Sequence, residues 1–383
     1  MRVLIAGGGI AGLLTAIALR RRAIDAAVFE SSPPDAAQGS GLLLGANALE
    51  LLTRLGLYDA VRARGREPTA MGVFSPSGTP VSVVDAGEWQ ARYGFRSVAV
   101  HREALHDVLR AALPDDAVEY GRRVLGFEQT ADRVRLRFES GSDADGDVLV
   151  GADGLRSAIR ERLLGGPKLR YSGQTSYRAI VDHVVDTGPF ADKLCEFWGN
   201  SGGLRFGFGR IDERRTYFFT THRVPAGQRD ASPEDAHRFL RGAFRSFPEE
   251  VRALVDHALS DRLIRTDIHD FAPLRCWHRG RVVLVGDAAH ATTPNLGQGA
   301  CQAIESSYVL ARELAQRDVE RAFTEYETIR MPRAHYVTRM SWRFGQLVGL
   351  RGPLGRFVRF GVMPRLSTDG MYEQTDRIFK LPY

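Results

Sequence analysis

The chain has 383 residues, of which 44% are hydrophobic and 26% are charged. This composition is ordinary for a soluble globular protein of two or three packed units, and it excludes disorder as the main state. The formal net charge is +6, but the arginines are scattered and form no basic stripe interleaved with aromatic residues, so we expect no nucleic-acid partner.

The chain opens with a predicted strand, helix and strand. Residues 2–6 form a continuous apolar run, which is typical of a buried parallel strand. Good helix formers follow over 13–22, and residues 26–30 have the pattern of a second short strand. This order predicts a βαβ unit at the start of the chain.

A glycine motif lies between the first predicted strand and helix. It reads Gly7-Gly8-Gly9-Ile10-Ala11-Gly12, a GxGxxG sequence, and Glu30 follows eighteen positions after its last glycine. Glycine at positions 7, 9 and 12 permits a tight turn, close approach of backbone N–H groups to a pyrophosphate, and close packing of helix on strand. The carboxylate of Glu30 can accept hydrogen bonds from a ribose. The spacing therefore predicts a dinucleotide-binding site.

The next part of the chain mixes strands with one helix. Residues 73–84 have the pattern of a hairpin, and 101–113 that of a helix. Three further strands are predicted at 124–128, 134–138 and 148–150, the last two separated by a glycine- and aspartate-rich segment. We expect these three strands to form an antiparallel meander rather than a second βαβ unit.

From about residue 169 to 270 the chain is rich in strands and aromatic residues. Strands are predicted at 175–181, 195–198, 204–208 and 216–221. A helix then begins at Ser232, with Pro233 in its first turn and Asp235 in the capping-box position. A buried strand returns at 281–285, and the chain is mainly helical from Gln298 to about Leu347. These changes predict a separate β-rich domain inserted into a nucleotide-binding unit that is discontinuous in sequence.

Two further motifs place an aspartate just beyond a predicted strand. Asp153 lies in Gly151-Ala152-Asp153-Gly154, and Asp287 lies in Gly286-Asp287-Ala288-Ala289-His290. The second motif continues through Pro294 to Gly297-Gln298-Gly299, where a helix begins. Ligands of open α/β sheets bind beyond the carboxyl ends of the strands, and a helix N-terminus offers free N–H groups there. Each motif alone also fits a structural turn; their order along the chain is what makes them specific.

These motifs in this order resemble the FAD-dependent aromatic-ring monooxygenases of the para-hydroxybenzoate hydroxylase type, and the resemblance covers nearly the whole chain. It implies an α/β fold with a Rossmann-like FAD-binding domain of the glutathione reductase type, an inserted β-sheet substrate domain and C-terminal helices. The expected boundaries are 1–70, 97–165 and 274–345 for the FAD-binding domain, 71–96 and 166–273 for the substrate domain, and 346–383 for a C-terminal helical segment.

The resemblance also assigns roles to residues. It implies that Gly7, Gly9, Gly12 and Glu30 hold the ADP half of FAD, that Arg102 approaches the pyrophosphate, that Asp153 belongs to a motif serving both FAD and NAD(P)H, that Asp287 binds the ribityl chain, and that Pro294, Gly297, Gln298 and Gly299 lie beside the isoalloxazine. The chain departs from the family pattern at Glu305, which is followed by Ser306 instead of aspartate.

The stretch 292–299 looks most like that of urate hydroxylases and zeaxanthin epoxidases. In urate hydroxylases an arginine and a tyrosine of the β-rich domain face the substrate, and the matching positions here are Arg205 and Tyr217. The competing interpretation is a surface arginine and a sheet tyrosine at the domain edge.

The activity implied by the resemblance is hydroxylation of a small aromatic or heteroaromatic substrate. NADH or NADPH would reduce FAD as a transient co-substrate, and O2 would react through a flavin C4a-hydroperoxide. Two alternatives stay open: an FAD-dependent epoxidase of an alkene or polyketide, and a nucleotide-binding carrier without turnover. The tryptophans and lysines do not match the pattern of flavin-dependent halogenases.

Other features predict no further chemistry. The three cysteines and the histidines lack metal-ligand spacing, so we expect no metal site. The sequence Gly199-Asn200-Ser201-Gly202-Gly203 matches the G-x-S-x-G nucleophile motif, but the residues after it alternate like a strand, which predicts a hairpin loop. No run of apolar residues is long enough for an integral membrane segment, and we expect a cytoplasmic monomer or homodimer. Residues 344–366 are basic and aromatic, and their glycines and prolines argue against one long amphipathic helix.

Overall fold

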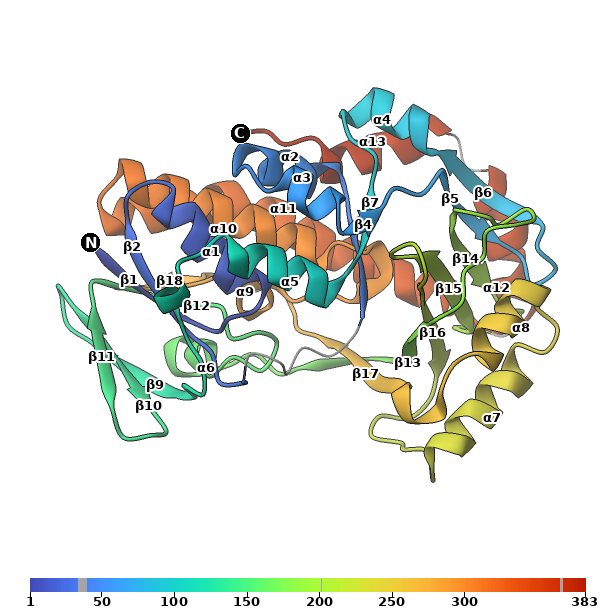
Figure 1. Ribbon diagram of the computed structural model, residues 1–383, viewed down its shortest axis with the longest axis horizontal. Coiled ribbons are helices and arrows are strands. Elements are labelled where there is room, and N and C mark those ends of the chain that lie inside the picture. Colours follow the sequence, from blue (N-terminus) through green and yellow to red (C-terminus); the bar gives the residue numbers. More distant parts are fainter. Residues whose placement is uncertain (34–39, 201, 366–367) are drawn as a thin grey trace.

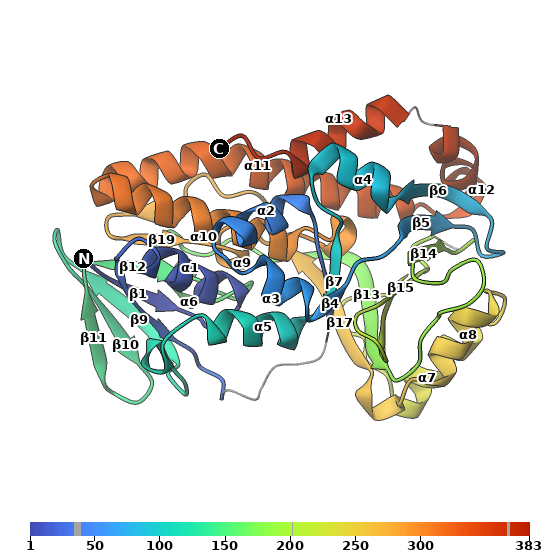
Figure 2. The same ribbon diagram turned by 45° about the horizontal axis from the view of Figure 1, so that its top comes forward.

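The computed structural model describes residues 1–33, 40–200, 202–365 and 368–383. The molecule is elongated, with a six-stranded sheet and its helices toward one end and a seven-stranded sheet toward the other (Figure 1). The long helix α11 (Val319–Val348) runs from the first part toward the second (Figure 2). Each sheet carries its own cluster of buried apolar residues.

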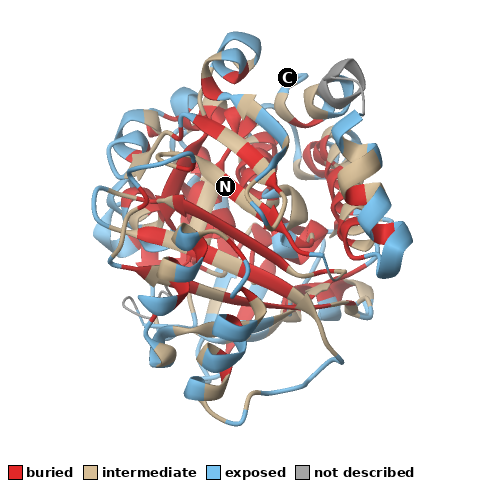
Figure 3. Ribbon diagram, turned by 90° about the vertical axis from the view of Figure 1, so that its right-hand side faces the viewer, coloured by how far each residue is buried: buried red, intermediate tan, exposed pale blue. Residues whose placement is uncertain are grey.

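The six-stranded sheet is built from three distant parts of the chain. Its order is β18 (His278–Arg279), β19 (Val282–Leu284), β12 (Val148–Gly151), β1 (Arg2–Ala6), β2 (Asp25–Phe29) and β8 (Val118–Glu119). All neighbouring pairs are parallel except the edge pair of β18 and β19. Ala6 pairs with Gly151, and Gly151 pairs with Leu284, so β1, β12 and β19 end at the same edge. The strands through the middle of the molecule are buried over much of their length (Figure 3).

Helices cover this sheet. Helix α1 (Ile10–Arg20) is buried from Ile10 to Leu19, because it lies between the sheet and α10 (Gly299–Gln316). The Ser307 hydroxyl donates to the carbonyl of Ala11 over 2.9 Å and joins the two helices. The remaining helices of this part are α2 (Ala46–Arg54), α3 (Tyr58–Arg62), α5 (Arg102–Ala111), α6 (Ala158–Leu164) and α9 (Asp287–His290).

The predicted meander is partly wrong. Strand β10 (Val134–Phe138) is the middle strand of a three-stranded sheet, with β9 (Val124–Gln129) on one side and β11 (Asp143–Gly146) on the other. The sequence pattern had predicted a separating segment at β11, and residues 148–150 belong to β12 in the parallel sheet. Burial gives the reason. β12 is apolar and buried on both faces, as parallel strands are, while β10 alternates buried and exposed residues.

The seven-stranded sheet has two different faces. Its order is β17 (Ile264–Asp270), β13 (Arg170–Val181), β16 (Thr216–Arg223), β15 (Arg205–Arg210), β14 (Leu194–Trp198), β5 (Ala70–Phe74) and β6 (Pro80–Asp85). One face buries Phe206, Phe208 and Phe218 in the core that includes α7 (Pro233–Ala243) and α8 (Glu249–Asp256). Because side chains alternate along a strand, Arg205 and Tyr217 lie on the opposite face.

Several predicted local features are confirmed. The hairpin at 73–84 is formed by β5 and β6. The Ser232 hydroxyl caps α7 by accepting the N–H of Asp235 over 3.1 Å. The segment after α11 is broken as expected: α12 (Gly352–Phe357) leads into a π-helical turn, Val358–Val362, and a 3-10 turn, Met363–Arg365.

The last helix returns toward the nucleotide-binding half. It is α13 (Thr368–Phe379), which lies beside α4 (Ala86–Tyr93) (Figures 1 and 2). A small antiparallel sheet of β3 (Gly41–Leu44), β7 (Val98–His101) and β4 (Gly65–Arg66) stands between the two larger sheets (Figure 1). None of the helices in the described ranges has the length and apolar character needed to cross a lipid bilayer.

Candidate functional site

The three glycine and aspartate motifs converge at one edge of the parallel sheet. Gly7 follows β1, Asp153 follows β12 and Gly286 follows β19. A Cβ atom added to Gly7 would lie 2.5 Å from the carbonyl oxygen of Ala152, and one added to Gly286 would lie 2.7 Å from the Cβ of Ala11. Segments more than a hundred residues apart are therefore in direct contact, as the shared FAD site implied by the family resemblance requires.

Arg160 links the second motif to the third. Its buried guanidinium donates to the carbonyl oxygens of Leu155, over 2.7 Å, and of Ala288, over 3.1 Å. It also lies over the ring of Phe271, with 4.6 Å between the guanidinium carbon and the ring centroid. Arg160 fixes the spacing of the two loops, a role that the sequence did not reveal.

The first motif combines a crowded part with an open part. A Cβ atom on Gly12 would collide with the carbonyl oxygen of Gly7, whereas one on Gly9 would meet no protein atom within 4 Å. Glu30 accepts the N–H of Gly8 over 2.7 Å. Burial opposes ionisation of Glu30, but hydrogen bonds from the N–H groups of Ser32 and Gly8 outweigh it and lower the pKa of the carboxyl. An ionised acceptor thus stands beside backbone that a ligand can approach.

Asp153 is engaged by its own loop. One carboxylate oxygen accepts the Ser157 hydroxyl over 2.5 Å, and the other accepts the N–H of Ile159 over 3.1 Å at the start of α6. Burial raises the pKa of Asp153, and these hydrogen bonds oppose the rise. Asp153 therefore shapes the loop after β12 with the oxygens that a ligand would otherwise use.

Asp287 has the opposite character. It begins α9 and is exposed to solvent, yet the protein around it raises the pKa of its carboxyl, while the charges of Arg102 and Arg160 oppose the rise. A carboxyl that solvent reaches although protein surrounds it lies within a concave surface. Arg102 is itself exposed at the start of α5. Both side chains are free to meet a ligand.

The third motif ends in the backbone segment from Pro294 to Gly299, which we call the ledge. Pro294 and Gly297 are exposed, and Gly297 adopts φ +62°, which favours glycine. A Cβ atom on Gly297 or Gly299 would meet no protein atom within 4 Å. Gln298 instead points inward and accepts the side-chain N–H of Asn47 over 3.0 Å. The ledge is thus exposed on its outer side and fixed from behind.

Glu305 is the centre of a buried polar network that sequence reasoning missed. Its fully buried carboxylate accepts hydrogen bonds from Arg330 at 2.5 Å, Arg333 at 2.6 Å, Asn47 at 2.6 Å, Gln302 at 2.9 Å and the Tyr383 hydroxyl at 2.7 Å. Burial opposes ionisation, but the charges of Arg330 and Arg333 outweigh it and lower the pKa of Glu305. Through Asn47 the network continues to Gln298 and so supports the ledge.

Ser306 occupies the position where the family pattern has aspartate. Its hydroxyl lies 2.7 Å from Nε2 of His290, and Arg330 donates to it over 3.3 Å. All three groups are buried. The departure from the family pattern is therefore accommodated by a neutral hydrogen-bonded pair, His290 and Ser306, behind the third motif.

Arg205 connects the seven-stranded sheet with the ledge. Its buried guanidinium donates to Oδ1 of Asn295 over 2.5 Å, to Thr221 over 2.9 Å and to Glu196 over 3.2 Å. Asn295 directly follows Pro294, so the guanidinium lies at the third motif. The interpretation of Arg205 as a surface arginine is wrong; its contact with a substrate stays a prediction.

Tyr217 lies on the same sheet face as Arg205. Its ring packs on the backbone of Gly41, since a Cβ atom there would lie 2.5 Å from ring atoms. The described part of the chain provides no hydrogen-bond partner for its hydroxyl. Burial raises the pKa of Tyr217, with Arg178 opposing the rise, so the phenol is neutral at pH 7. A neutral hydroxyl of this kind is a hydrogen-bond donor for a ligand.

The G-x-S-x-G sequence lies in a hairpin, as predicted. It joins β14 to β15, which pair antiparallel, so the strand-to-helix turn of a nucleophile elbow is absent at this place. Ser201 itself lies outside the described residues.

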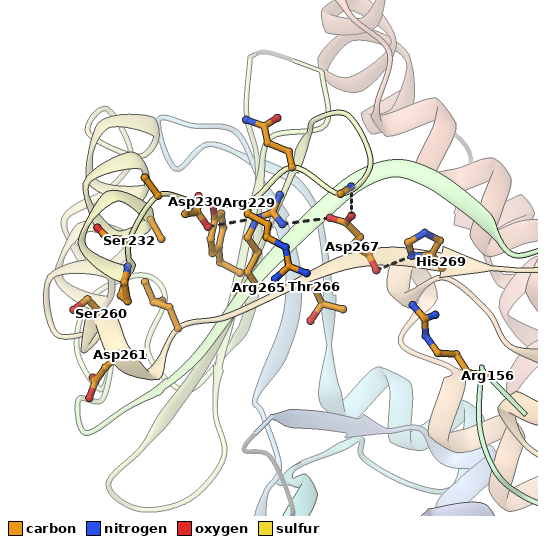
Figure 4. Close-up of a pocket in the computed structure, with 17 residues that line it drawn as sticks. Arg156, Arg229, Asp230, Ser232, Ser260, Asp261, Arg265, Thr266, Asp267 and His269 are labelled. Carbon is orange, nitrogen blue, oxygen red and sulfur yellow. Dashed lines mark hydrogen bonds and ion pairs between the residues drawn. The ribbon is translucent and has the colours of Figure 1, made fainter. Parts of the chain in front are cut away.

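A polar cavity of about 580 Å³ lies along β17 and α7 (Figure 4). Arg156, Arg229 and Arg265 line it, and Arg265 forms ion pairs with Asp230 at 3.4 Å and Asp267 at 3.7 Å. No residue predicted for the flavin site lines this cavity, although Arg156 belongs to the same loop as Asp153. Asp230, Asp261 and Asp267 line the same cavity, so its three arginines are matched by three carboxyl groups.

Comparison with known proteins agrees with the geometry. The chain matches the family model described as FAD binding domain over residues 1–341. It is 39% identical over 378 residues to the aurachin C monooxygenase/isomerase of Stigmatella aurantiaca, covering 98% of this chain and 97% of the relative. It is 35% identical over 350 residues to the 3-amino-4-hydroxybenzoate 2-monooxygenase of Streptomyces cremeus, covering 90% and 87%.

A solved structure shows the same fold. HpxO of Klebsiella pneumoniae, complexed with FAD and uric acid, matches with a TM-score of 0.92 and 28% sequence identity, covering 100% of this chain and 97% of that chain. The predicted α/β fold and the predicted cofactor, FAD, are thereby confirmed. The chain belongs to the FAD-binding family of flavoprotein monooxygenases, enzymes that incorporate one oxygen atom into an aromatic substrate.

Proposed function

We propose that the chain is a single-component monooxygenase that uses NAD(P)H and O2 to hydroxylate a small aromatic or heteroaromatic substrate with an apolar body. The observation that carries the proposal is the position of Arg205. Its contact with Asn295 joins the face of the seven-stranded sheet that carries Tyr217 to the third motif, so a substrate on that face lies next to the ledge from Pro294 to Gly299.

The residues present fit FAD. Gly9, Gly297 and Gly299 leave open space where a Cβ atom would stand, and Glu30 and Asp287 offer carboxylates beside that space. Arg102 would balance the charge of the pyrophosphate, and α10, which begins at Gly299, favours negative charge at its N-terminus. When bound, FAD carries electrons from NAD(P)H to O2 and supplies the oxygen-transfer chemistry.

The sheet face around Arg205 and Tyr217 suits a planar, apolar ring. Phe219 folds over Gly207, and Leu194 folds over Gly209, since a Cβ atom on either glycine would collide with the neighbouring side chain. Phe219, Leu194 and Tyr217 are half-buried. Aromatic rings stack in offset or edge-to-face contacts on such a surface, which also keeps water from the reacting atoms.

Two polar groups orient the substrate on this face. The neutral phenol of Tyr217 donates a hydrogen bond to an oxygen or nitrogen atom of the ring. Arg205, already bound to Glu196 and Asn295, holds the sheet face at a fixed distance from the ledge. Orientation of this kind accounts for a large part of catalysis when the cofactor performs the chemistry.

The substrate class is also supported by the relatives. The Streptomyces cremeus enzyme is named for 3-amino-4-hydroxybenzoate, and the Klebsiella pneumoniae structure contains uric acid. Both are small ring compounds.

A substrate panel tests the proposal. The FAD-loaded protein is given NADH or NADPH with phenols, hydroxypyridines, purines or quinolones, and reductant consumption and product are measured with 18O2. We expect one class to accelerate reductant consumption at least about tenfold and to gain one labelled atom on a ring carbon. An epoxide product would favour the epoxidase alternative, and no reductant consumption with any compound would favour a carrier.

Asp287 provides a test of the cofactor site. We expect Asp287→Ala to purify without bound FAD, because the carboxylate is the accessible polar group of the third motif, and Asp153→Ala to lose thermal stability instead. Absorbance at 450 nm and a melting curve separate the two outcomes. Full yellow colour in purified Asp287→Ala would remove this residue from the site.

A further inference from the structure

The segment that follows the long helix α11 exposes an unusual number of apolar side chains. Leu347, Leu350, Leu354, Phe357 and Val362 are 40%, 38%, 69%, 63% and 39% exposed, and we call these five residues the apolar patch. They are half of the ten large exposed hydrophobic residues in the described part of the chain, within sixteen positions. Surface apolar residues are normally scattered singly, so this cluster needs a cause.

The side of this segment opposite the apolar patch is packed against the rest of the protein, and this packing keeps the patch facing outward. The buried guanidinium of Arg359 donates to the carbonyl oxygens of Leu350, at 2.7 Å, Val348, at 3.0 Å, and Asn200, at 3.0 Å. Gly355 is buried against the backbone of Leu350, where a Cβ atom would collide. Leu354 and Phe357 stand three residues apart in α12 and therefore share a helix face. The segment is anchored from within and presents its apolar side chains outward.

Positive charge surrounds the patch. From residue 328 to 368 the chain contains no aspartate or glutamate and eight arginines, of which five are exposed; the other three are bound inside the protein. Arg351, Arg356 and Arg365 are exposed among the apolar residues, and none forms an ion pair with a described residue. A surface that combines protruding apolar side chains with arginines matches the interface of a bilayer with negatively charged headgroups.

We propose that the apolar patch docks the protein peripherally on an anionic lipid bilayer. Leu354 and Phe357 enter the headgroup region, and Arg351, Arg356 and Arg365 pair with lipid phosphates. A second copy of the chain is the poorer partner, because a two-fold contact through this patch would bring arginines against arginines. Nucleic acid would supply negative charge but no apolar phase for Leu354 and Phe357.

The patch lies close to the proposed substrate face. Gly345, five residues before Leu350, packs against Asn295, and the ring of Phe344 lies 6.0 Å from that of Trp198 in β14. Docking therefore brings the part of the proposed substrate face around Trp198 and Arg205 close to the lipid surface, where an apolar substrate concentrates. This last step rests on the proposed function, whereas the docking itself does not.

Vesicle flotation tests the docking without turnover. The FAD-loaded protein is mixed with phosphatidylcholine vesicles that contain either no phosphatidylglycerol or about 40 mole per cent of it, because anionic lipid attracts basic segments. We expect binding to the anionic vesicles only, weakened by salt. Leu354→Ser with Phe357→Ser should weaken binding at least about 100-fold, because two buried apolar side chains are lost, and Arg351→Gln with Arg356→Gln about thirtyfold.

A matched control separates the patch from general surface hydrophobicity. Leu125 and Leu259 are 63% and 55% exposed, far from the patch in sequence, so Leu125→Ser with Leu259→Ser should bind like the wild type. Equal binding to neutral and anionic vesicles, or unchanged binding of the Leu354 and Phe357 variant, overturns the proposal. The proposal is also overturned if light scattering shows that the wild type is a homodimer, that the Leu354 and Phe357 variant is a monomer, and vesicles bind neither protein. Substrate hydroxylation is measured in a separate assay without vesicles, so a failure of the docking proposal can be distinguished from a failure of the proposed function.

Discussion

Gly9 and Gly12 stand three residues apart in one turn but satisfy different requirements. Gly12 is needed by the protein itself, because a side chain there would collide with the backbone of Gly7. Gly9 faces open space and has φ −72°, a value that any residue adopts. The fold therefore does not require glycine at this position, and we expect the lack of a side chain to serve FAD binding.

The two glycines make opposite predictions. We expect Gly12→Ala to destabilise the protein by about 3 kcal/mol or more, through overpacking of a fixed backbone, and Gly9→Ala to keep the wild-type melting temperature while weakening FAD binding at least about tenfold. Melting curves of the flavin-free protein and FAD titration separate the effects. A stable Gly12→Ala variant, or unchanged FAD affinity in Gly9→Ala, would contradict this assignment.

Arg205 connects the seven-stranded sheet to the ledge through its hydrogen bond to Asn295. In Arg205→Ala the sheet face loses its contact with Asn295, so we expect product formation to fall on the order of 100-fold, because small misplacements of reacting groups carry such a cost. NAD(P)H oxidation should continue without product. Arg210→Ala is the control, since Arg210 lies on the other face of β15 and pairs with Asp192 at 2.7 Å. Unchanged coupling in Arg205→Ala would exclude Arg205 from substrate positioning.

At the scale of elements, Glu305 holds three helices and the segment after α13 together. Asn47 of α2, Glu305 of α10, Arg330 of α11 and Tyr383 meet in one buried cluster. Helix positions are thereby set by charge as well as by apolar packing. The ledge after Pro294 depends on this cluster, because Gln298 is bound to Asn47.

Two substitutions measure how much this buried cluster contributes to the free energy of unfolding. Glu305→Gln leaves Arg330 and Arg333 buried without a counter-charge, and we expect a loss of about 3–5 kcal/mol in the free energy of unfolding. Tyr383→Phe removes one hydrogen bond and should cost about 1 kcal/mol. Urea unfolding at pH 7 gives both values. A Glu305→Gln variant as stable as Tyr383→Phe would show that the carboxylate charge contributes little.

Sequence patterns predicted most elements and failed where tertiary context decides. The strands around Phe206 and Phe218 and the capped helix at Ser232 carry strong local signals. Asp143–Gly146 has turn-like composition, yet it forms β11 because its backbone completes the ladder with β10 and Asp145 pairs with Arg135 at 2.7 Å. Residues 148–150 are close to this hairpin in sequence, but their two-sided burial places them in the parallel sheet.

The same limit applies to the candidate site. The three motifs were recognisable because each carries its chemistry within a few residues, and their convergence follows from strand order. The cluster around Glu305 was not recognisable, because Asn47, Arg330 and Tyr383 are separated from it by 258, 25 and 78 positions. Arg160 and Arg359 look like surface arginines in the sequence and become buried only in the folded chain.

For the whole molecule, buried histidine makes stability depend on pH. Burial and the charge of Arg330 lower the pKa of His290 to about 3, below the value of about 6.5 in an unfolded chain. The unfolded state therefore binds a proton that the folded state does not, and stability falls as pH drops below about 6.5, by about 1.4 kcal/mol per pH unit, until about pH 3. Burial also lowers the pKa values of His222 and His335, each to about 4, with the same sign.

The prediction is checked by comparing His290→Asn with the wild type. Urea unfolding at pH 7, 6 and 5 should show a steeper loss of stability in the wild type, with the difference between the proteins changing by about 1.4 kcal/mol per pH unit below pH 6. Parallel stability curves for the two proteins would mean that the pKa of His290 is not lowered by folding.

The arrangement of β19, β12 and β1 side by side bears on how the protein is made. These strands come from residues 282–284, 148–151 and 2–6, and the ledge follows β19. A ribosome must release about three quarters of the chain before the three loops can meet, so we expect the coenzyme to be captured late in biosynthesis. Such distant pairing slows folding, and a scarcity of riboflavin during expression would leave the half-assembled sheet edge open to proteases.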